Sequence, residues 1–308
     1  MIGLGILTTY CLGAVLYWRF VSIIPPVLYL VLFLLLWRVP ESPLWLLSHR
    51  GPEDCREALQ WLRGTEEVSE EISQIQEAKE QQSHGLTMTE AIRNLSRPDV
   101  RTPFLLITIN FYLVMLSGPF AIIFYSVEIF QNTGANIDKY LASIIVAAIR
   151  VTGGVVGIFL IQKLPRVRLS MVVMTMMSVS MAVLGGALYL KSLSFTSSLL
   201  DVVTVISVTF YMFCFGAAVG PLQWVFLGEL LPREYKVLSG VITSLATSAV
   251  FIVTKVFPTL LESLSPHGTY WLFSAISLAS NIFYFFFMPE TRGKTAVEIK
   301  QMFLKQQK

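Results

Sequence analysis

The sequence predicts an all-α membrane protein, a bundle of about eight transmembrane helices interrupted by one large aqueous segment. Of its 308 residues, 54% are hydrophobic and only 14% are charged, whereas about a quarter of the residues of a soluble domain are charged. Eight apolar stretches approach the length of about 20 residues that a helix needs to cross a bilayer. More than half of the 20 acidic residues lie in one segment, residues 39–102.

The expected spans are, in chain order, approximately residues 1–17, 20–38, 103–128, 140–162, 169–190, 202–228, 238–260 and 270–288. The first is short, and Met1 lies inside the apolar run with no basic region before it and no cleavage site after it. This pattern does not fit a secretory signal. We interpret it as a spanning helix whose beginning is missing.

Loop charges predict the orientation, because cytoplasmic loops are enriched in Lys and Arg. If residues 39–102 are cytoplasmic, the inside loops and tail carry Lys163, Arg166, Arg168, Arg233, Lys236, Arg292, Lys294, Lys300, Lys305 and Lys308. The outside loops beyond that segment then carry only Lys139 and Lys191. We therefore expect both the 39–102 segment and the carboxyl tail to be cytoplasmic, which leaves Asn94 of the sequon Asn94-Leu95-Ser96 unglycosylated.

Short amphipathic helices are expected in the first part of the cytoplasmic segment, with a disordered acidic loop as the alternative. Ser42 is a candidate cap for a helix whose first residue is Pro43, a position that needs no N–H. A second helix ends at Gly64. Its predicted apolar face consists of Ala58, Leu59, Trp61 and Leu62.

Helical spacing continues through the rest of the segment. Val68, Ile72 and Ile75 recur at intervals of three and four residues, which favours a further helix. Thr87 and Glu90 form the pattern of a capping box, in which each side chain accepts a hydrogen bond from the other residue's backbone N–H. A helix containing Ile92 and Leu95 follows it.

Small residues and prolines mark special places in the later spans. Gly153 and Gly157 are one turn apart, so a neighbouring helix backbone can approach that face. Pro119 and Pro221 interrupt the spans 103–128 and 202–228 near mid-membrane. Transporters bind solutes at broken helices of this kind, although a kink that only aids packing is an equal alternative.

The composition does not point to an enzyme, a cofactor or nucleic acid. The net charge of +3 is small, and the basic residues lie at loop ends instead of in tracts. No nucleophile–base pair, phosphate loop or metal-ligand spacing is recognisable. The cysteines and histidines are scattered through the chain, at Cys11, Cys55, Cys214, His49, His84 and His267.

Several motifs, in order and at matching spacing, resemble the sugar porter family of the major facilitator superfamily, and within it the insect facilitated trehalose transporters. They are Pro40-Glu41-Ser42-Pro43-Leu44-Trp45-Leu46-Leu47, residues 58–64 (ALQWLRG), residues 220–224 (GPLQW), residues 228–232 (GELLP), residues 253–257 (VTKVF) and residues 289–295 (PETRGKT). Together they extend over nearly the whole chain. Lys255, within one of them, is expected to anchor its helix near the outer end.

The resemblance implies a fold, a mechanism and a set of domains. Met1 would lie within the fifth of twelve helices, so that part of an amino-terminal half is missing. Residues 1–38 would be the last two helices of that half, residues 39–102 a cytoplasmic linker, residues 103–288 a complete six-helix half and residues 289–308 the tail. A sugar-like solute would be held between the halves and carried across the plasma membrane by alternating access, with the lipid bilayer as the other partner.

The chain departs from the family pattern where the family holds sugar hydroxyls. Val114, Met115 and Phe120 stand at the positions of two glutamines and an asparagine in the seventh helix of the family. Ala246-Thr247 aligns with an Asn-Trp pair, and Gln223 replaces a usual proline. Because each buried hydroxyl without a partner costs roughly 1–3 kcal/mol, we expect a pocket for a less polar cargo and weak uptake of trehalose and glucose.

Arg150 lies near the middle of the span 140–162, where a charge costs about 3 kcal/mol or more unless it faces a cavity or a partner. It is expected either to contact anionic or strongly polar cargo, or to pair with a carboxylate such as Glu128 or snorkel along the bundle. With the family motifs, the expected solute contacts are Ser117, Gly118, Phe120, Tyr125, Arg150 and Trp224.

A second group of residues is expected to hold the inside gate closed. The resemblance implies that Glu229 pairs with arginines of the inside loops, here Arg166 and Arg168, in a latch of ion pairs that break on opening. Glu41 and Glu290 complete the group. The preferred function is a facilitative carrier; the alternative is a non-transporting sensor or partner subunit. Retention of most of these gate residues favours the carrier.

Overall fold

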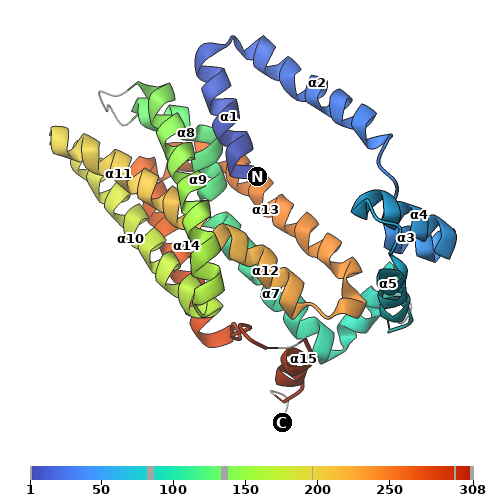
Figure 1. Ribbon diagram of the computed structural model, residues 1–308. Coiled ribbons are helices and arrows are strands. Elements are labelled where there is room, and N and C mark those ends of the chain that lie inside the picture. Colours follow the sequence, from blue (N-terminus) through green and yellow to red (C-terminus); the bar gives the residue numbers. More distant parts are fainter. Residues whose placement is uncertain (1, 82–86, 133–137, 196, 295, 306–308) are drawn as a thin grey trace. The chain divides into compact units, whose positions relative to one another are not determined.

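The computed structural model describes residues 2–81, 87–132, 138–195, 197–294 and 296–305, and its regular elements within these ranges are helices (Figure 1). Seven of them, counting two broken helices as one span each, are long and apolar enough to cross a membrane. They agree with seven of the predicted spans. The eighth, α1 (Ile2–Val15), is apolar but shorter.

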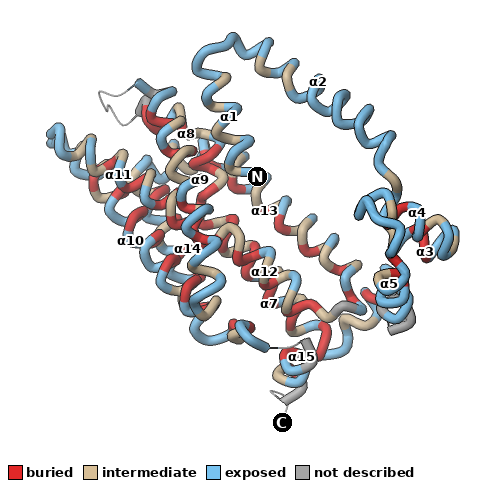
Figure 2. The backbone as a smooth tube through the Cα atoms, viewed as in Figure 1, coloured by how far each residue is buried: buried red, intermediate tan, exposed pale blue. Residues whose placement is uncertain are grey.

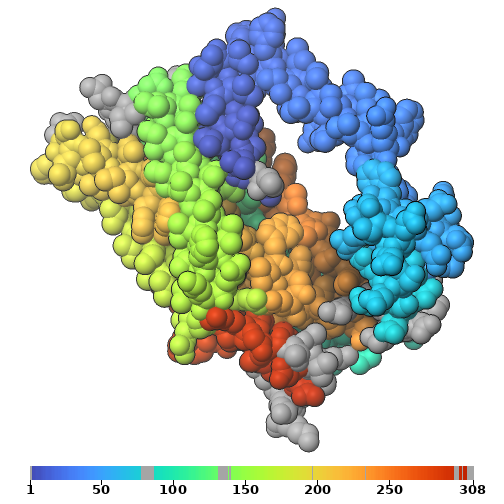
Figure 3. Space-filling model, in the orientation of Figure 1, coloured from blue at the N-terminus to red at the C-terminus, as the bar shows by residue number. Residues whose placement is uncertain are grey.

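The chain divides into two packing units, residues 1–15 with 87–308, called unit 1, and residues 16–86, called unit 2. These boundaries differ from the predicted boundaries at residues 38 and 102. The reason is that α1 packs on α9 (Lys139–Lys163), and α6 (Met88–Arg93) packs on α13 (Val237–Ser263). Figure 3 shows α1 lying against α9 along one face of unit 1.

The other helices of unit 1 are α7 (Pro98–Leu116), α8 (Pro119–Asn132), α10 (Arg166–Ser192), α11 (Ser198–Cys214), α12 (Gly220–Leu230), α14 (Ser265–Phe287) and α15 (Ala296–Lys305), with short turns η1 (Asn94–Ser96), η2 (Phe215–Val219) and η3 (Arg233–Tyr235). The α10 helix lies between α14 and α11 (Figure 1). Its buried side chains Met174, Met177, Met181 and Leu184 recur every three to four residues, so they form one continuous apolar stripe.

Unit 2 contains α2 (Trp18–Leu36), α3 (Pro43–His49), α4 (Pro52–Arg63) and α5 (Ser69–Gln81). No residue of α2 is buried (Figure 2), as is expected of an apolar helix whose neighbour is lipid. The three shorter helices share a core that includes Cys55, Ala58, Leu59, Val68 and Ile72. The prediction of packed amphipathic helices is therefore confirmed for the described part of the segment.

Two details of the predicted helices are corrected. The α3 helix begins at Pro43 as expected, but the Ser42 side chain makes no capping hydrogen bond. Trp61 and Leu62 are exposed, because the buried stripe of α4 passes through Cys55, Ala58 and Leu59 instead. In unit 1 the capping box at Thr87 and Glu90 is confirmed, with the Thr87 N–H donating to Glu90 Oε2 at 2.9 Å.

Candidate functional site

The helix predicted over residues 103–128 is broken in its middle. The α7 helix ends at Leu116 and α8 begins at Pro119, so Ser117 and Gly118 form the break. Gly118 has a φ of +104°, which a residue with a Cβ rarely adopts. A Cβ there would also lie 2.6 Å from the Phe273 ring of α14. The break at Pro119 is thus confirmed, and both backbone conformation and packing require its glycine.

Ser117 is fully buried and its polar groups are satisfied within the protein. Its hydroxyl donates to the Val114 carbonyl at 2.8 Å, and the Tyr211 hydroxyl of α11 donates to the Ser117 carbonyl at 2.9 Å. These bonds tie the broken helix to α11. In this conformation Ser117 and the buried Gly118 therefore shape the break and do not face an open cavity.

The second interruption, before Pro221, is a π-helical turn. Residues Phe215–Val219 of η2 join α11 to α12, and such turns are frequent at functional sites because they displace side chains from the regular helical pattern. The small residues of α9 pack closely on this turn. A Cβ on Gly153 would lie 2.5 Å from the Phe213 carbonyl, and one on Gly157 would overlap the backbone of Ala217. The predicted close approach at this glycine pair is confirmed.

Arg150 lies on the same face of α9 and points to the π turn. Its guanidinium carbon is 5.5 Å from the centre of the Phe215 ring, a cation–π contact worth about 0.5–2 kcal/mol. Its Nε and Nη1 are shielded from solvent and have no hydrogen-bond partner among the described residues. The ion pair with Glu128 is not formed, and Glu128 is exposed on α8.

Tyr10 adds a hydroxyl from α1 to this region. It donates to the Ile123 carbonyl of α8 and accepts a hydrogen bond from Ser126 Oγ at 3.1 Å. Tyr10 is not among the site residues predicted from the sequence, because the spacing of a single tyrosine in an apolar stretch does not show which helix it meets.

The other expected solute contacts are divided between two places. Phe120 is half-buried and packs edge-on against Phe215 with ring centres 6.3 Å apart, so it joins Arg150 at the π turn. Trp224 is 52% exposed and packs against Phe111 instead. Tyr125 is half-buried, and its hydroxyl donates to the Thr254 carbonyl at 3.0 Å.

The expectation that Val114 and Met115 line a pocket is not met. Val114 is 0% exposed and Met115 is 7% exposed, because α7 turns both side chains into its packing with other helices. Two amides that the sequence analysis did not assign to a site, Asn110 and Gln223, are also buried, with no partner among the described residues for either oxygen or nitrogen. Only Gln223 carried a signal in the sequence, because it replaces a proline of the family motif.

The predicted gate residues Arg166, Glu229 and Glu290 come together at one end of unit 1, with Thr291; we call these four residues the polar cluster. Arg166 begins α10, Glu229 lies in the last turn of α12, and the other two follow α14. The Arg166 guanidinium forms an ion pair with Glu229 and donates to Thr291 Oγ1 at 3.3 Å. Both partners of the ion pair are largely shielded, which strengthens it relative to a surface pair.

Glu290 supplies a cap to α10 from a distant part of the chain. Its two carboxylate oxygens accept the backbone N–H groups of Arg166 and Val167 at 2.9 and 3.0 Å. The local N-cap residue is Pro165, which provides no side-chain bond. A carboxylate at this position satisfies orphan N–H groups and complements the helix dipole, so α10 is tied to the segment after α14.

One predicted gate residue of unit 1 does not join the polar cluster, and another belongs to unit 2. Arg168 is exposed and forms no ion pair with any described residue. It follows the buried Val167 on the helix, and the rotation of one residue points its side chain outward. The predicted pairing of Glu229 with Arg168 is therefore wrong for this conformation. Glu41 is exposed and belongs to unit 2, between α2 and α3.

Comparisons with known proteins agree with the motif analysis. The sequence model of the family described as "Sugar (and other) transporter" matches residues 1–303. The facilitated trehalose transporter Tret1 of Apis mellifera ligustica is 30% identical over 301 residues, which cover 97% of this chain and 60% of that protein. A Tret1-2 homolog of Drosophila sechellia is 30% identical, with coverage of 97% and 62%. The chain therefore spans about 60% of the length of these relatives.

Solved structures show the same fold. The partially occluded inward-open xylose transporter XylE of E. coli superimposes with a TM-score of 0.71 at 22% identity, covering 95% of this chain and 61% of that chain. Its inward-open form gives a TM-score of 0.70 at 23% identity, with coverage of 96% and 62%. The fold is thus that of a major facilitator transporter.

Proposed function

The chain belongs to the sugar (and other) transporter family. From this we propose that it forms part of a facilitative carrier, which moves a sugar or related small solute across the plasma membrane by alternating access. Support for a working carrier comes from the polar cluster, whose ion pair and cap join the ends of α10, α12 and α14. In an alternating-access carrier, such a cluster would be bonded while the gate is closed and broken when it opens.

The observation that carries the proposal for the cargo is the unpartnered guanidinium of Arg150. A cation in a membrane interior is costly without a partner, and Phe215 compensates only part of that cost. An acceptor oxygen of a bound solute would supply the missing hydrogen bonds at Nε and Nη1. We assign Arg150, Phe120 and Phe215 to the solute site, with Trp224 and Tyr125 as further contacts reached when the carrier changes conformation.

The solute is expected to be less hydroxylated than trehalose. Phe120, at the π turn, offers no amide to a solute, and Val114 and Met115 are turned into helix packing, so hydroxyls of a disaccharide would lose partners at roughly 1–3 kcal/mol each. A small solute with one strong acceptor or an acidic group fits Arg150 better. No carboxylate lies in the middle of a described span, which favours a uniport over proton coupling.

Uptake of radiolabelled trehalose, glucose and small sugar acids into cells tests the proposal, with the chain expressed alongside any flanking sequence its gene encodes. We expect saturable, protonophore-insensitive uptake of an acidic or acceptor-bearing solute, and weak uptake of trehalose and glucose. Robust uptake of both sugars, each competing with the other, would contradict the assigned cargo.

Variants at Arg150 then test its role. Arg150→Gln should abolish uptake with normal surface expression, and Arg150→Lys should retain part of it, because the charge remains while the planar fork is lost. Arg101→Gln, at an exposed position of α7, is the matched control and should transport normally. If Arg150→Gln instead fails to reach the surface, while Arg150→Lys is fully active, the arginine is a structural cation.

A further inference from the structure

Unit 1 contains a cavity at the end of the bundle opposite to the polar cluster. It has a volume of about 600 Å³ and lies where α8 and α13 end, beside the last turns of α10 and the start of α14. The α10 helix runs from Arg166 of the polar cluster to Ser192 of this cavity. At 1.5 Å per residue, its 27 residues place the two sites roughly 40 Å apart, at opposite ends of the bundle.

The inner wall of the cavity is apolar and well packed. Phe257, Tyr270 and Ile129 line it and are otherwise buried, with exposed fractions of 1%, 2% and 4%. Leu188 and Leu261 complete this wall. The helices α13 and α14 meet at Ser265, whose φ of +62° makes the tight turn at the rim. The cavity therefore does not need to be opened by repacking of its core residues.

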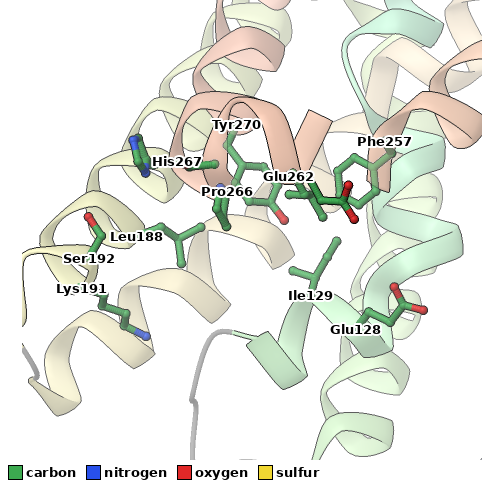
Figure 4. Close-up of a pocket in the computed structure, with 12 residues that line it drawn as sticks. Glu128, Ile129, Leu188, Lys191, Ser192, Phe257, Glu262, Pro266, His267 and Tyr270 are labelled. Atoms are coloured by element: carbon green, nitrogen blue, oxygen red, sulfur yellow. The ribbon is translucent and has the colours of Figure 1, made fainter. Parts of the chain in front are cut away.

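The charges around the cavity are distributed unevenly. Glu128 and Glu262 lie on one side of it, and Lys191 lies on the opposite side (Figure 4). Lys191 is neutralised by Asp201, with Nζ 2.5 Å from Oδ1. Neither glutamate forms an ion pair with a described residue, so the cavity carries two uncompensated negative charges beside an apolar and aromatic wall.

We propose that this cavity binds a small organic cation with an apolar or aromatic body. The ammonium group would lie between Glu128 and Glu262, and the body would pack on Phe257, Tyr270 and Ile129. Carboxylates attract the charge, and aromatic faces stabilise ammonium groups further by cation–π contact. An amphiphilic cation therefore matches both the acidic side of the cavity and its apolar wall.

Other classes of ligand fit less well. A sugar needs a partner for each hydroxyl, and the inner wall offers mainly hydrocarbon. A divalent metal ion requires several oxygen or nitrogen ligands, and the described residues contain no cluster of three acidic, histidine or cysteine side chains. An anion would be repelled by both glutamates.

Binding of benzyltrimethylammonium to the purified chain in phosphatidylcholine nanodiscs tests the proposal, with benzyl alcohol as the neutral counterpart. Neither lipid nor probe changes charge near neutral pH. We expect saturable binding of the cation and at least tenfold weaker binding of the alcohol. Glu128→Gln with Glu262→Gln should weaken cation binding about tenfold, the equivalent of about 1.4 kcal/mol. Both residues are exposed, so the double variant should fold.

The control is Glu57→Gln with Glu67→Gln, which removes two exposed glutamates of unit 2 and should leave binding unchanged. The proposal would be overturned if the cation and the alcohol bound equally, or if the wild type and the Glu128/Glu262 double variant bound the cation equally. Either result would show that the probe partitions into lipid. Displacement of the cation by trehalose or another sugar would assign the cavity to the solute and also overturn it. Because binding is measured without flux, this outcome is independent of the proposed transport function.

Discussion

At the scale of single residues, two arginines in the same turn of α10 have different environments. Arg166 is held by Glu229 and Thr291, whereas Arg168 is exposed. Their sequence context is similar, since both lie within three residues after Pro165. The difference arises because helical geometry points residues two positions apart to different faces.

This pair gives a matched test of the polar cluster. Arg166→Gln should destabilise the bundle by about 1–3 kcal/mol, because it leaves the partly buried carboxylate of Glu229 without its partner. Arg168→Gln should change stability by less than about 0.5 kcal/mol. Thermal unfolding of both variants in the same detergent measures the difference. A coupling energy near zero in the Arg166→Gln and Glu229→Gln double-mutant cycle would contradict the ion pair.

Helix contacts at the next scale depend on glycines in α9. Gly157 packs directly on the backbone of η2, whereas the nearest atom to a Cβ on Gly154 would be the Gly216 carbonyl at 3.9 Å. Gly157→Ala should therefore cost about 1–3 kcal/mol, since backbone cannot yield as a side chain does. Gly154→Ala should be neutral or slightly stabilising, because alanine favours the helix. The melting temperatures of the two variants test this difference. Equal values would mean that Gly157 does not contact the backbone of η2.

The capping box of α6 makes a second prediction at this scale. The Thr87 backbone N–H, and then its hydroxyl, hold the pKa of the Glu90 carboxylate below its usual value. Since the folded pKa is lowered, the contribution to stability is present above the unfolded pKa of about 4.3 and is lost as the pH falls through the folded pKa.

Amide hydrogen exchange measures this effect in α6. Thr87→Ala should increase exchange, consistent with the typical cost of about 1 kcal/mol for losing a cap. Thr89→Ala, an exposed position inside the helix, should not. The pH dependence of protection below about pH 4.3 should disappear in Glu90→Gln. If it persists there, another group controls the pH response.

For the whole molecule, the orientation inferred from loop charges predicts which ends of the bundle face the cytoplasm. The polar cluster and η1 should face the cytoplasm, and the cavity lined by Glu128 and Glu262 should face the outside of the cell. Asn94, in η1, should never carry a glycan. In a Cys11→Ser background, a membrane-impermeant maleimide applied to intact cells should label Ser194→Cys and not Ser96→Cys. Labelling of Ser96→Cys, or a glycan on Asn94, would reverse the orientation.

The sequence by itself determined the class of protein, the spans, the two interrupted helices and the family motifs. Each depends on local information: apolar length, proline and glycine positions, or residues adjacent in the chain. The glycine pair Gly153 and Gly157 was recognisable for the same reason, because one helical turn sets their common face.

Only the tertiary structure decided what each polar side chain meets. Residues 215 and 150, or 290 and 166, are far apart in the chain, and no spacing rule shows that Phe215 lies under Arg150 or that Glu290 caps α10. The burial of Val114 and Met115 likewise depends on how α7 is rotated against its neighbours, which is a property of the whole packing. The cavity depends on four helix ends meeting at one place, and its residues come from positions 128 to 270.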